Sequence, residues 1–196
     1  SQEYLINQNR LVQEKTAEAF QSSMERSLGF LHIKADEHTR KIWPTVHLRD
    51  AYAVPLADGY IFIPDSDENI LLMYARATSE GLEPGTRRVL KSILRPGDNA
   101  IDVGASLGMH TIAMASAVGP AGHLHAFEAE PRLKHVLDRT LATNGMHHVS
   151  LHPCAAGSED GEVRFNVAHT IGHSSIYDLG SDNLVRDTIS VPIKKL

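Results

Sequence analysis

A glycine-rich loop and two acidic residues carry the strongest chemical signal in the sequence. Asp102 lies near the end of a short apolar run, and the loop Gly104-Ala105-Ser106-Leu107-Gly108 follows that run directly. Glu128 ends a second apolar run at residues 123–127. Glycine lets bare backbone approach a ligand, and a carboxylate at a strand end can accept hydrogen bonds from ribose hydroxyls. The pattern therefore predicts a small-molecule site at the ends of two strands.

The same loop does not have the features of a phosphate-binding loop. Its spacing is G-x-x-x-G, with Ser106 where the dinucleotide fingerprint G-x-G-x-x-G has its second glycine, and it lacks the lysine of G-x-x-x-x-G-K-[ST]. The carboxylate of Asp102 also repels anions and attracts cations. These residues favour a ligand with a ribose and a positive charge but no phosphate. S-adenosylmethionine (SAM), a sulfonium with an ammonium group, fits that description.

Strands and helices that alternate after residue 99 would position this loop. The predicted strands are 100–103, 123–127, 149–153, 162–167 and 188–193, and the helices predicted between the first three are 111–118 and 131–144. This order is typical of a doubly wound α/β sheet with right-handed crossovers. In such sheets ligands bind outside the carboxyl ends of the strands, where the loop and Glu128 would meet.

The first 81 residues follow a different pattern. Residues 1 to about 40 contain no proline and have apolar residues at helical spacing, which predicts an amphipathic arm that packs on its own domain, dimerises, or joins further domains. Residues 46–63 alternate around Asp58-Gly59, which predicts a β-hairpin with positive φ in its turn. Helices are predicted after residues 65–68 and from Pro84 onward. We divide the chain into a helical arm (1–45), a hairpin and helix (46–81) and an α/β domain (82–196).

Residues 82–193 resemble the FkbM family of class I SAM-dependent methyltransferases. Residues 96–108, PGDNAIDVGASLG, are similar to the family's opening motif, with Ser106 where asparagine is usual. Residues 126–131, AFEAEP, are similar to its second-strand motif, with Ala129 in place of a proline. Residues 154–161 and His173-Ser174-Ser175 are similar to the third-strand exit and the insertion that follows it. The resemblance implies a Rossmann-like sheet that binds SAM.

The resemblance also implies roles for individual residues. Asp102 and Gly104 would contact the methionine part of SAM, Glu128 its ribose, and Cys154-Ala155 its adenine. The full set of implied cofactor-binding residues is Asp102, Gly104, Ala105, Ser106, Gly108, Met109, His110, Thr111, Glu128, Ala129, Cys154 and Ala155. Simpler roles stay open: a tight turn for the glycines, a solvated acid for Glu128, and helix capping or core packing for Ser106, His110 and Thr111.

The function implied is transfer of a methyl group from SAM to a hydroxyl oxygen of a sugar, a glycan or a secondary metabolite. No residue is identified as the catalytic base. The family's sheet has seven strands, whereas residues 82–196 correspond to the first three plus an insertion, so we expect a fragment of a longer polypeptide, a chain that lost the remainder, or a degenerate relative. A non-catalytic scaffold or oligomerisation domain with the same fold, and an NAD-binding oxidoreductase module, remain alternatives.

Composition narrows the partners. The 196 residues include 19 Lys and Arg against 24 Asp and Glu, a net charge of −5 without a basic run, so no nucleic-acid partner is expected. No apolar stretch is long enough for a membrane span. The single cysteine, Cys154, excludes an intramolecular disulfide and predicts a cytoplasmic protein, and it is expected to be a buried apolar residue rather than a nucleophile. The twelve histidines are expected to be structural or exposed, with no metal bound.

Overall fold

The computed structural model describes residues 46–48, 50–67, 70–71, 73–74, 82–178, 180 and 184–196. The chain divides into two compact units, Ser1–Val46 and His47–Leu196, and the described residues lie almost entirely in the second unit. The helical arm predicted for residues 1–45 lies outside the described residues. The domain boundaries proposed at residues 45 and 81 stay predictions.

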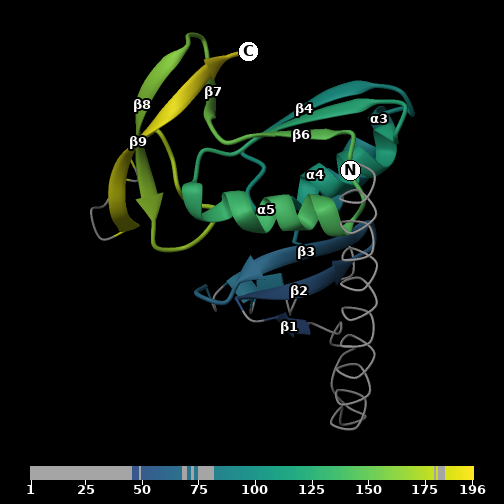
Figure 1. Cartoon of the computed structure of the whole chain (residues 1–196), viewed down its shortest axis with the longest axis horizontal. Helices are drawn as coiled ribbons and strands as arrows, with labels where there is room; N and C mark the ends of the chain where they lie inside the picture. The colour runs from purple at the N-terminus through teal and green to yellow at the C-terminus, as the bar shows by residue number, and fades with distance from the viewer. Residues whose placement is uncertain are drawn as a thin grey trace, which may run out of the picture. The chain divides into compact units, whose positions relative to one another are not determined.

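A three-stranded parallel sheet forms the centre of the second unit (Figure 1). Its strands, in spatial order, are β4 (Asn99–Val103), β5 (His123–Phe127) and β6 (Val149–His152), and the connecting helices are α4 (Met109–Val118) and α5 (Pro131–Thr143). Ala126 of β5 and Leu137 of α5 are fully buried against each other and pack with Ala105. The α/β class and these strands and helices are as predicted, with ends that differ by one or two residues.

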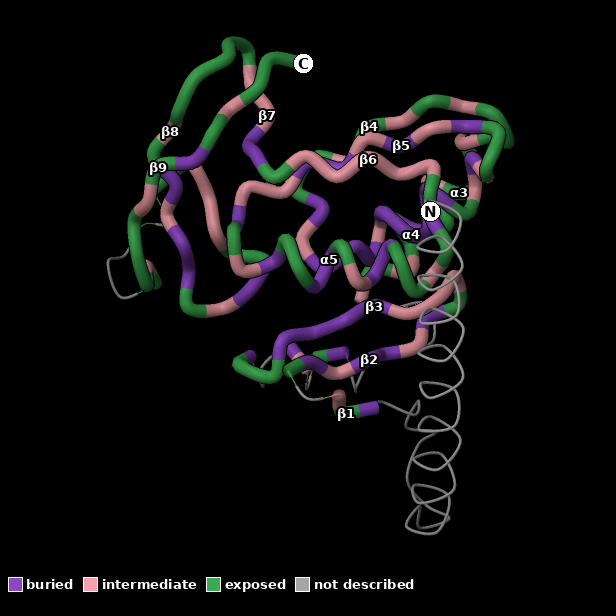
Figure 2. Tube along the Cα trace, viewed as in Figure 1, coloured by how far each residue is buried: buried purple, intermediate pink, exposed green. Residues whose placement is uncertain are grey.

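The other face of this sheet is open in the part of the chain that the structure describes. Ile101 and Val103 of β4 are 51% and 56% exposed, although strands of a parallel sheet are usually covered on both faces. Figure 2 shows β4 as exposed and intermediate in burial. The same face carries three histidines that contact one another or their neighbours. Nδ1 of His125 lies 3.0 Å from Nε2 of His152, and Nε2 of His123 lies 2.9 Å from the hydroxyl of Ser150.

A β-hairpin forms a second sheet, as predicted. It consists of β2 (Ala51–Leu56) and β3 (Gly59–Pro64), with β1 (Val46–Leu48) beside β2. Gly59 has the predicted positive φ (140°), but Asp58 does not. The Asp58 carboxylate instead binds Arg87 and Lys91 of α3 (Pro84–Ile93), and both Arg87 and Asp58 are almost fully buried. The turn aspartate therefore joins the hairpin to a helix.

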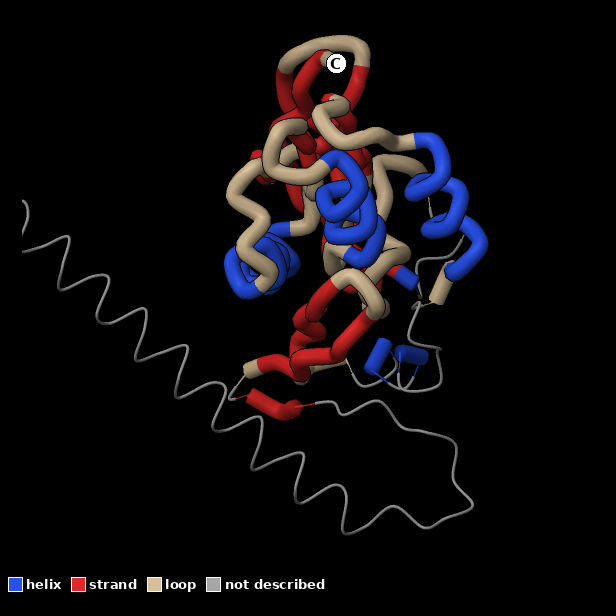
Figure 3. Tube along the Cα trace, turned by 90° about the vertical axis from the view of Figure 1, so that its right-hand side faces the viewer, coloured by secondary structure: helices blue, strands red, loops and turns tan. Residues whose placement is uncertain are grey.

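Helix α5 lies beside β3 (Figure 1), and Figure 3 shows the helices and strands of this region from the side. Side chains at the C-terminal end of α5, rather than another strand, close the outer edge of β3. Asn144, the residue after α5, accepts a hydrogen bond from the backbone N–H of Tyr60 (2.8 Å) and donates one to the Tyr60 carbonyl (2.6 Å). The hydroxyl of Thr140 accepts from the N–H of Phe62 (3.2 Å). These bonds satisfy edge groups that would otherwise face water or another chain.

A third sheet has the order β7-β9-β8, and its strands are β7 (Ala155–Gly157), β8 (Gly161–Ala168) and β9 (Val185–Lys195). β9 is antiparallel to β8 and parallel to β7. The sequence predicted β8 and β9, although both are longer than expected, and missed β7. Phe165, Val167, Val191 and Ala155 form its core.

A short helical segment follows Asp67, as the acidic residues there predicted. The Asp67 carboxylate accepts a hydrogen bond from the N–H of Ile70 (3.1 Å), which is the contact made by an N-cap residue. No helix among the described residues has the length and apolar composition needed to cross a membrane.

Candidate functional site

A cavity of about 230 Å³ lies where the parallel strands end, beside the β7-β9-β8 sheet. Small-molecule pockets usually measure about 300–1,000 Å³, so this cavity is somewhat smaller than a typical ligand pocket. It is lined by residues 103–104, 106, 127–130, 133, 154–156, 165, 172 and 174–176. The cavity therefore combines the ends of β4, β5 and β6 with a wall from β8 and the loop after it.

The glycine-rich loop forms the floor of this cavity. The backbone N–H groups of Gly104 and Ala105 both donate to the carbonyl of Phe127 (2.9 Å each), which joins the loop to β5. Gly104 has φ 81°, and no atom lies within 4 Å of the position that a Cβ would occupy. At Gly108 a Cβ would lie 2.7 Å from Leu137, so this second glycine permits close packing on α5. Gly104 alone of the two leaves open space for a ligand.

Ser106 holds an uncommon conformation in the same loop. It has φ 51° and is the one non-glycine residue with positive φ among the described residues. Asparagine tolerates this left-handed region better than most residues, which gives a physical reason for the asparagine that is usual at this position of the FkbM motif. The backbone N–H of Ser106 donates to Oε2 of Glu128 (2.7 Å), so the conformation is held by the strand-end carboxylate.

Glu128 lies at the carboxyl end of β5 and lines the cavity. Oε2 accepts from Ser106 and Oε1 accepts from the N–H of Glu130 (2.7 Å). Burial raises the pKa of Glu128 and the nearby Glu130 carboxylate adds to the increase, although backbone hydrogen bonds act in the opposite direction. Each carboxylate oxygen has a second lone pair, so Glu128 can accept two further hydrogen bonds from a ligand.

The structure brings some of the predicted site residues together and places the others elsewhere. Those that line the cavity are Gly104, Ser106, Glu128, Ala129, Cys154 and Ala155. Those that do not line it are Asp102, Ala105, Gly108, Met109, His110 and Thr111. The predicted residues that line the cavity lie at the carboxyl ends of the strands or shortly after them. Most of the predicted residues that do not line it lie in the glycine-rich loop and in the first turn of α4.

The polar residues of the second set have partners inside the fold. Oδ2 of Asp102 accepts a hydrogen bond from the hydroxyl of Thr111 (2.7 Å), which is fully buried. Nε2 of His110 lies 3.5 Å from Oε2 of Glu83 and makes no hydrogen bond in the described part of the chain. The full burial of Thr111 fits core packing, one of the simpler roles left open for it. Contact of Asp102, His110 and Thr111 with a cofactor stays a prediction.

Cys154 is buried beside the cavity, and burial raises the pKa of its thiol, with a smaller opposite effect from Lys194. A buried thiol with a raised pKa is a poor nucleophile, because the thiolate is the reactive form. This environment agrees with the apolar role predicted for Cys154.

Sequence reasoning missed the wall of the cavity. Phe165 of β8 and the loop residues Gly172, Ser174, Ser175 and Ile176 all line it. Only Ser174 and Ser175 were singled out in the sequence, as part of a motif without a role. The sequence carried no local signal for this wall. Glu130 requires partners because it is 2% exposed, and this burial is visible only in the structure.

No protein-family model matches the chain. A stretch of 58 residues is 36% identical to the protein-L-isoaspartate O-methyltransferases of Ignicoccus hospitalis and Methanothrix thermoacetophila, covering 30% of this chain and 28% of each relative. Similar solved structures include a SAM-dependent O-methyltransferase from Thermotoga maritima (21% identity, TM-score 0.36, 57% of this chain, 48% of that chain). Another is P. horikoshii TYW2 in complex with MeSAdo (13% identity, TM-score 0.41, 55% and 37%).

Proposed function

We propose that this chain is the cofactor-binding part of a SAM-dependent methyltransferase. The observation that carries the proposal is Glu128, a half-buried strand-end carboxylate that lines the cavity beside the open space at Gly104. The curated relatives with 36% identity are methyltransferases, which supports the same class. The chain spans 28% of their length, so the activity of the whole protein belongs to the proposal.

The residues present fit the nucleoside end of SAM. Glu128 would accept hydrogen bonds from the two ribose hydroxyls, and the open space above Gly104 would admit the sulfur side of the ribose. Cys154 and Ala155 would contact the adenine from the β6 side. SAM supplies an electrophilic methyl group on its sulfonium, and the contribution of this chain is to hold and orient that donor, which is a large part of catalysis by alignment.

The finer assignment to the FkbM type rests on the motifs at residues 96–108 and 126–131. It implies an acceptor hydroxyl on a sugar, a glycan or a secondary metabolite. Asp102 and the first turn of α4, at Met109 to Thr111, would lie nearer to the methionine end of SAM in this proposal. The structure identifies no general base, and the acceptor class therefore rests on the resemblance alone.

Calorimetric titration of the 196-residue chain with S-adenosylhomocysteine (SAH) and with NAD tests the proposal. SAH should bind and NAD should not. Glu128→Ala should weaken SAH binding at least tenfold, because two charge-assisted hydrogen bonds to ribose are lost. Glu159→Ala, a change at an exposed glutamate outside the cavity, is the matched control and should leave the affinity unchanged. Binding of NAD alone, or no heat with SAH, would refute the assignment.

A further inference from the structure

The loop after β8, residues 169–176, forms one side of the cavity and is here called the wall loop. Gly172, Ser174, Ser175 and Ile176 of this loop line the cavity. The backbone of Ser175 exchanges two hydrogen bonds with Asn166 of β8 (2.8 and 3.0 Å). That pairing fixes the end of the wall loop, and a separate set of side-chain contacts fixes the rest.

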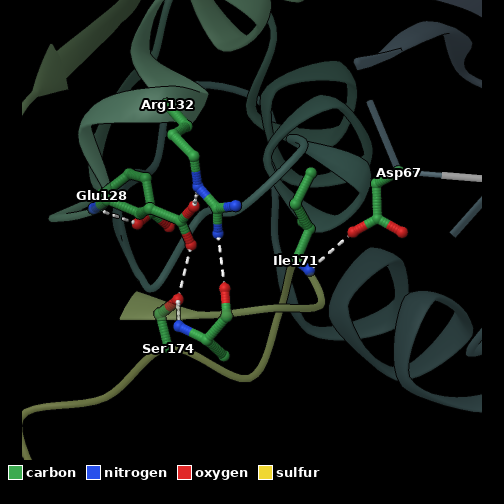
Figure 4. A network of polar contacts seen from close by, with 7 residues as sticks. Asp67, Glu128, Arg132, Ile171 and Ser174 are labelled. Carbon is green, nitrogen blue, oxygen red and sulfur yellow. Dashed lines mark hydrogen bonds and ion pairs between the residues drawn. The ribbon is translucent and has the colours of Figure 1, made fainter. Parts of the chain in front are cut away.

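A closed ring of polar contacts holds the wall loop on the start of α5 (Figure 4). The hydroxyl of Ser174 donates to Oε2 of Glu130 (2.6 Å), and the other oxygen of Glu130 accepts from Nε of Arg132. Arg132 in turn donates to the carbonyl of Ala168 (2.9 Å), whose N–H donates to the Ser174 hydroxyl (2.9 Å). Every polar group in the ring has a partner of the correct kind.

Burial makes this ring costly to break. Glu130 is 2% exposed, so its charge depends on the partners that Arg132 and Ser174 provide. A second anchor lies on the far side of the wall loop, where the N–H of Ile171 donates to Oδ2 of Asp67 (2.9 Å). Because Asp67 also caps the helical segment at Ile70, the wall loop is held from two elements distant in the sequence.

The ring is joined directly to Glu128. The N–H of Glu130 donates to Oε1 of Glu128, so residues 128–130 orient the strand-end carboxylate and the wall loop at once. A displacement of Glu130 would move both the proposed ribose contact and the wall loop. The two sides of the cavity are thus set by one short segment after β5.

We propose that Glu130, Arg132 and Ser174 are positioning residues for recognition of the adenosine part of the cofactor. They hold the wall loop, whose Ser175 and Ile176 line the same cavity as Glu128. The inference rests on the proposed function. It adds that the ring acts on the adenosine end of the ligand and that Glu130, Arg132 and Ser174 set the width of the pocket there. None of the three needs to contact the reacting methyl group.

The test compares adenosine with SAH as ligands of the 196-residue chain. Ser174→Ala opens the ring while leaving Glu130 paired with Arg132. It should lower the affinities for adenosine and SAH by the same factor, about tenfold, because the ring acts on the adenosine part that both ligands contain. Arg132→Met should lower both affinities further, and Arg132→Lys should recover part of the lost affinity. Lys134→Met, on the exposed side of the same helix, should change neither affinity.

Hydrogen exchange separates positioning from general stability. Amides of residues 172–176 should exchange faster in the Ser174→Ala chain without ligand, whereas those of β4 and β5 should not change. If the unmodified chain binds neither ligand, the proposed function fails and the inference fails with it. If it binds SAH but not adenosine, or if Ser174→Ala and Arg132→Met leave both affinities within twofold, the inference alone is overturned.

Discussion

The contact between Gly59 and Asn144 should appear as a strong thermodynamic coupling between two residues that are far apart in the sequence. A Cβ added at Gly59 would lie 2.0 Å from Oδ1 of Asn144, and Gly59 has φ 140°, where side chains are strained. Gly59→Ala must therefore displace the Asn144 amide, and Asn144→Ala removes it. Both changes break the same bonds to Tyr60, so their effects on the free energy of unfolding cannot add.

The magnitudes follow from the bonds. Asn144 makes two hydrogen bonds to Tyr60 and donates a third to the Thr140 carbonyl (2.6 Å). At about 0.5–1.5 kcal/mol each, with water reaching part of the site, Asn144→Ala should lower the free energy of unfolding by about 2–3 kcal/mol. Gly59→Ala should lose the same hydrogen bonds, and backbone strain should lower the free energy of unfolding by about 1–3 kcal/mol more. The double variant should lower the free energy of unfolding by about 3–6 kcal/mol, which is about 2–3 kcal/mol less than the sum of the two single effects.

Urea unfolding followed by circular dichroism measures all four chains of this cycle, with the slope against urea checked for constancy. Gly85→Ala is the matched control, because a Cβ there meets no atom within 4 Å and no positive φ is required. Its effect should add to that of Asn144→Ala. If Gly59→Ala and Asn144→Ala are additive within about 0.5 kcal/mol, the edge contact does not have the role described.

Three further predictions follow from the pKa shifts and the loop. Burial raises the pKa of Glu128 above 4.5, and the carboxylate is the form that accepts from ribose, so SAH affinity should rise with pH through that pKa. An affinity that does not change from pH 4 to 8, or a pH dependence that is unchanged in Glu128→Gln, contradicts this. Burial alone would raise the pKa of Asp58, but hydrogen bonds from Lys91 and Arg87 hold it below 3.8. Its stabilising effect is complete above pH 3.8 and is lost as pH falls through the lowered pKa, so urea midpoints should drop less between pH 6 and 3 in Asp58→Asn; an equal drop would show that the pair does not titrate as described. Ser106→Asn should keep the thermal stability of the chain, whereas Ser106→Val should lose about 1–2 kcal/mol, and equal melting temperatures would argue against a left-handed conformation there.

Local patterns predicted most of the described elements, although not β7, and two of the residues that line the cavity, Gly104 and Glu128. Pro84 begins α3 as predicted, and Gly119 and Gly145 with positive φ follow the ends of α4 and α5. Gly104 and Glu128 could be placed because each follows a strand whose direction in a parallel sheet is known. These signals lie within a few residues of the feature that they predict.

The missed features are long-range. Ser174 meets Glu130 across 44 positions and Ile171 meets Asp67 across 104, and neither distance leaves a trace in local spacing. Asp102 is a different case, because strand alternation places it on the face opposite Ile101 and Val103. Strand alternation alone therefore predicts that the Asp102 side chain faces α4. In the structure this side chain contacts Thr111 of α4.

The closure of β3 by α5 has a consequence for the order of folding during synthesis. Tyr60 and Phe62 are joined to Asn144 and Thr140 across 84 and 78 positions, although β2 and β3 themselves pair through a two-residue turn. At about 5–20 residues per second, the ribosome needs roughly 4–17 s to add the intervening residues. An isolated hairpin is marginal in water, so β2 and β3 should become stable only when α5 docks, and folding should be completed late rather than from the N-terminal side of the sheet.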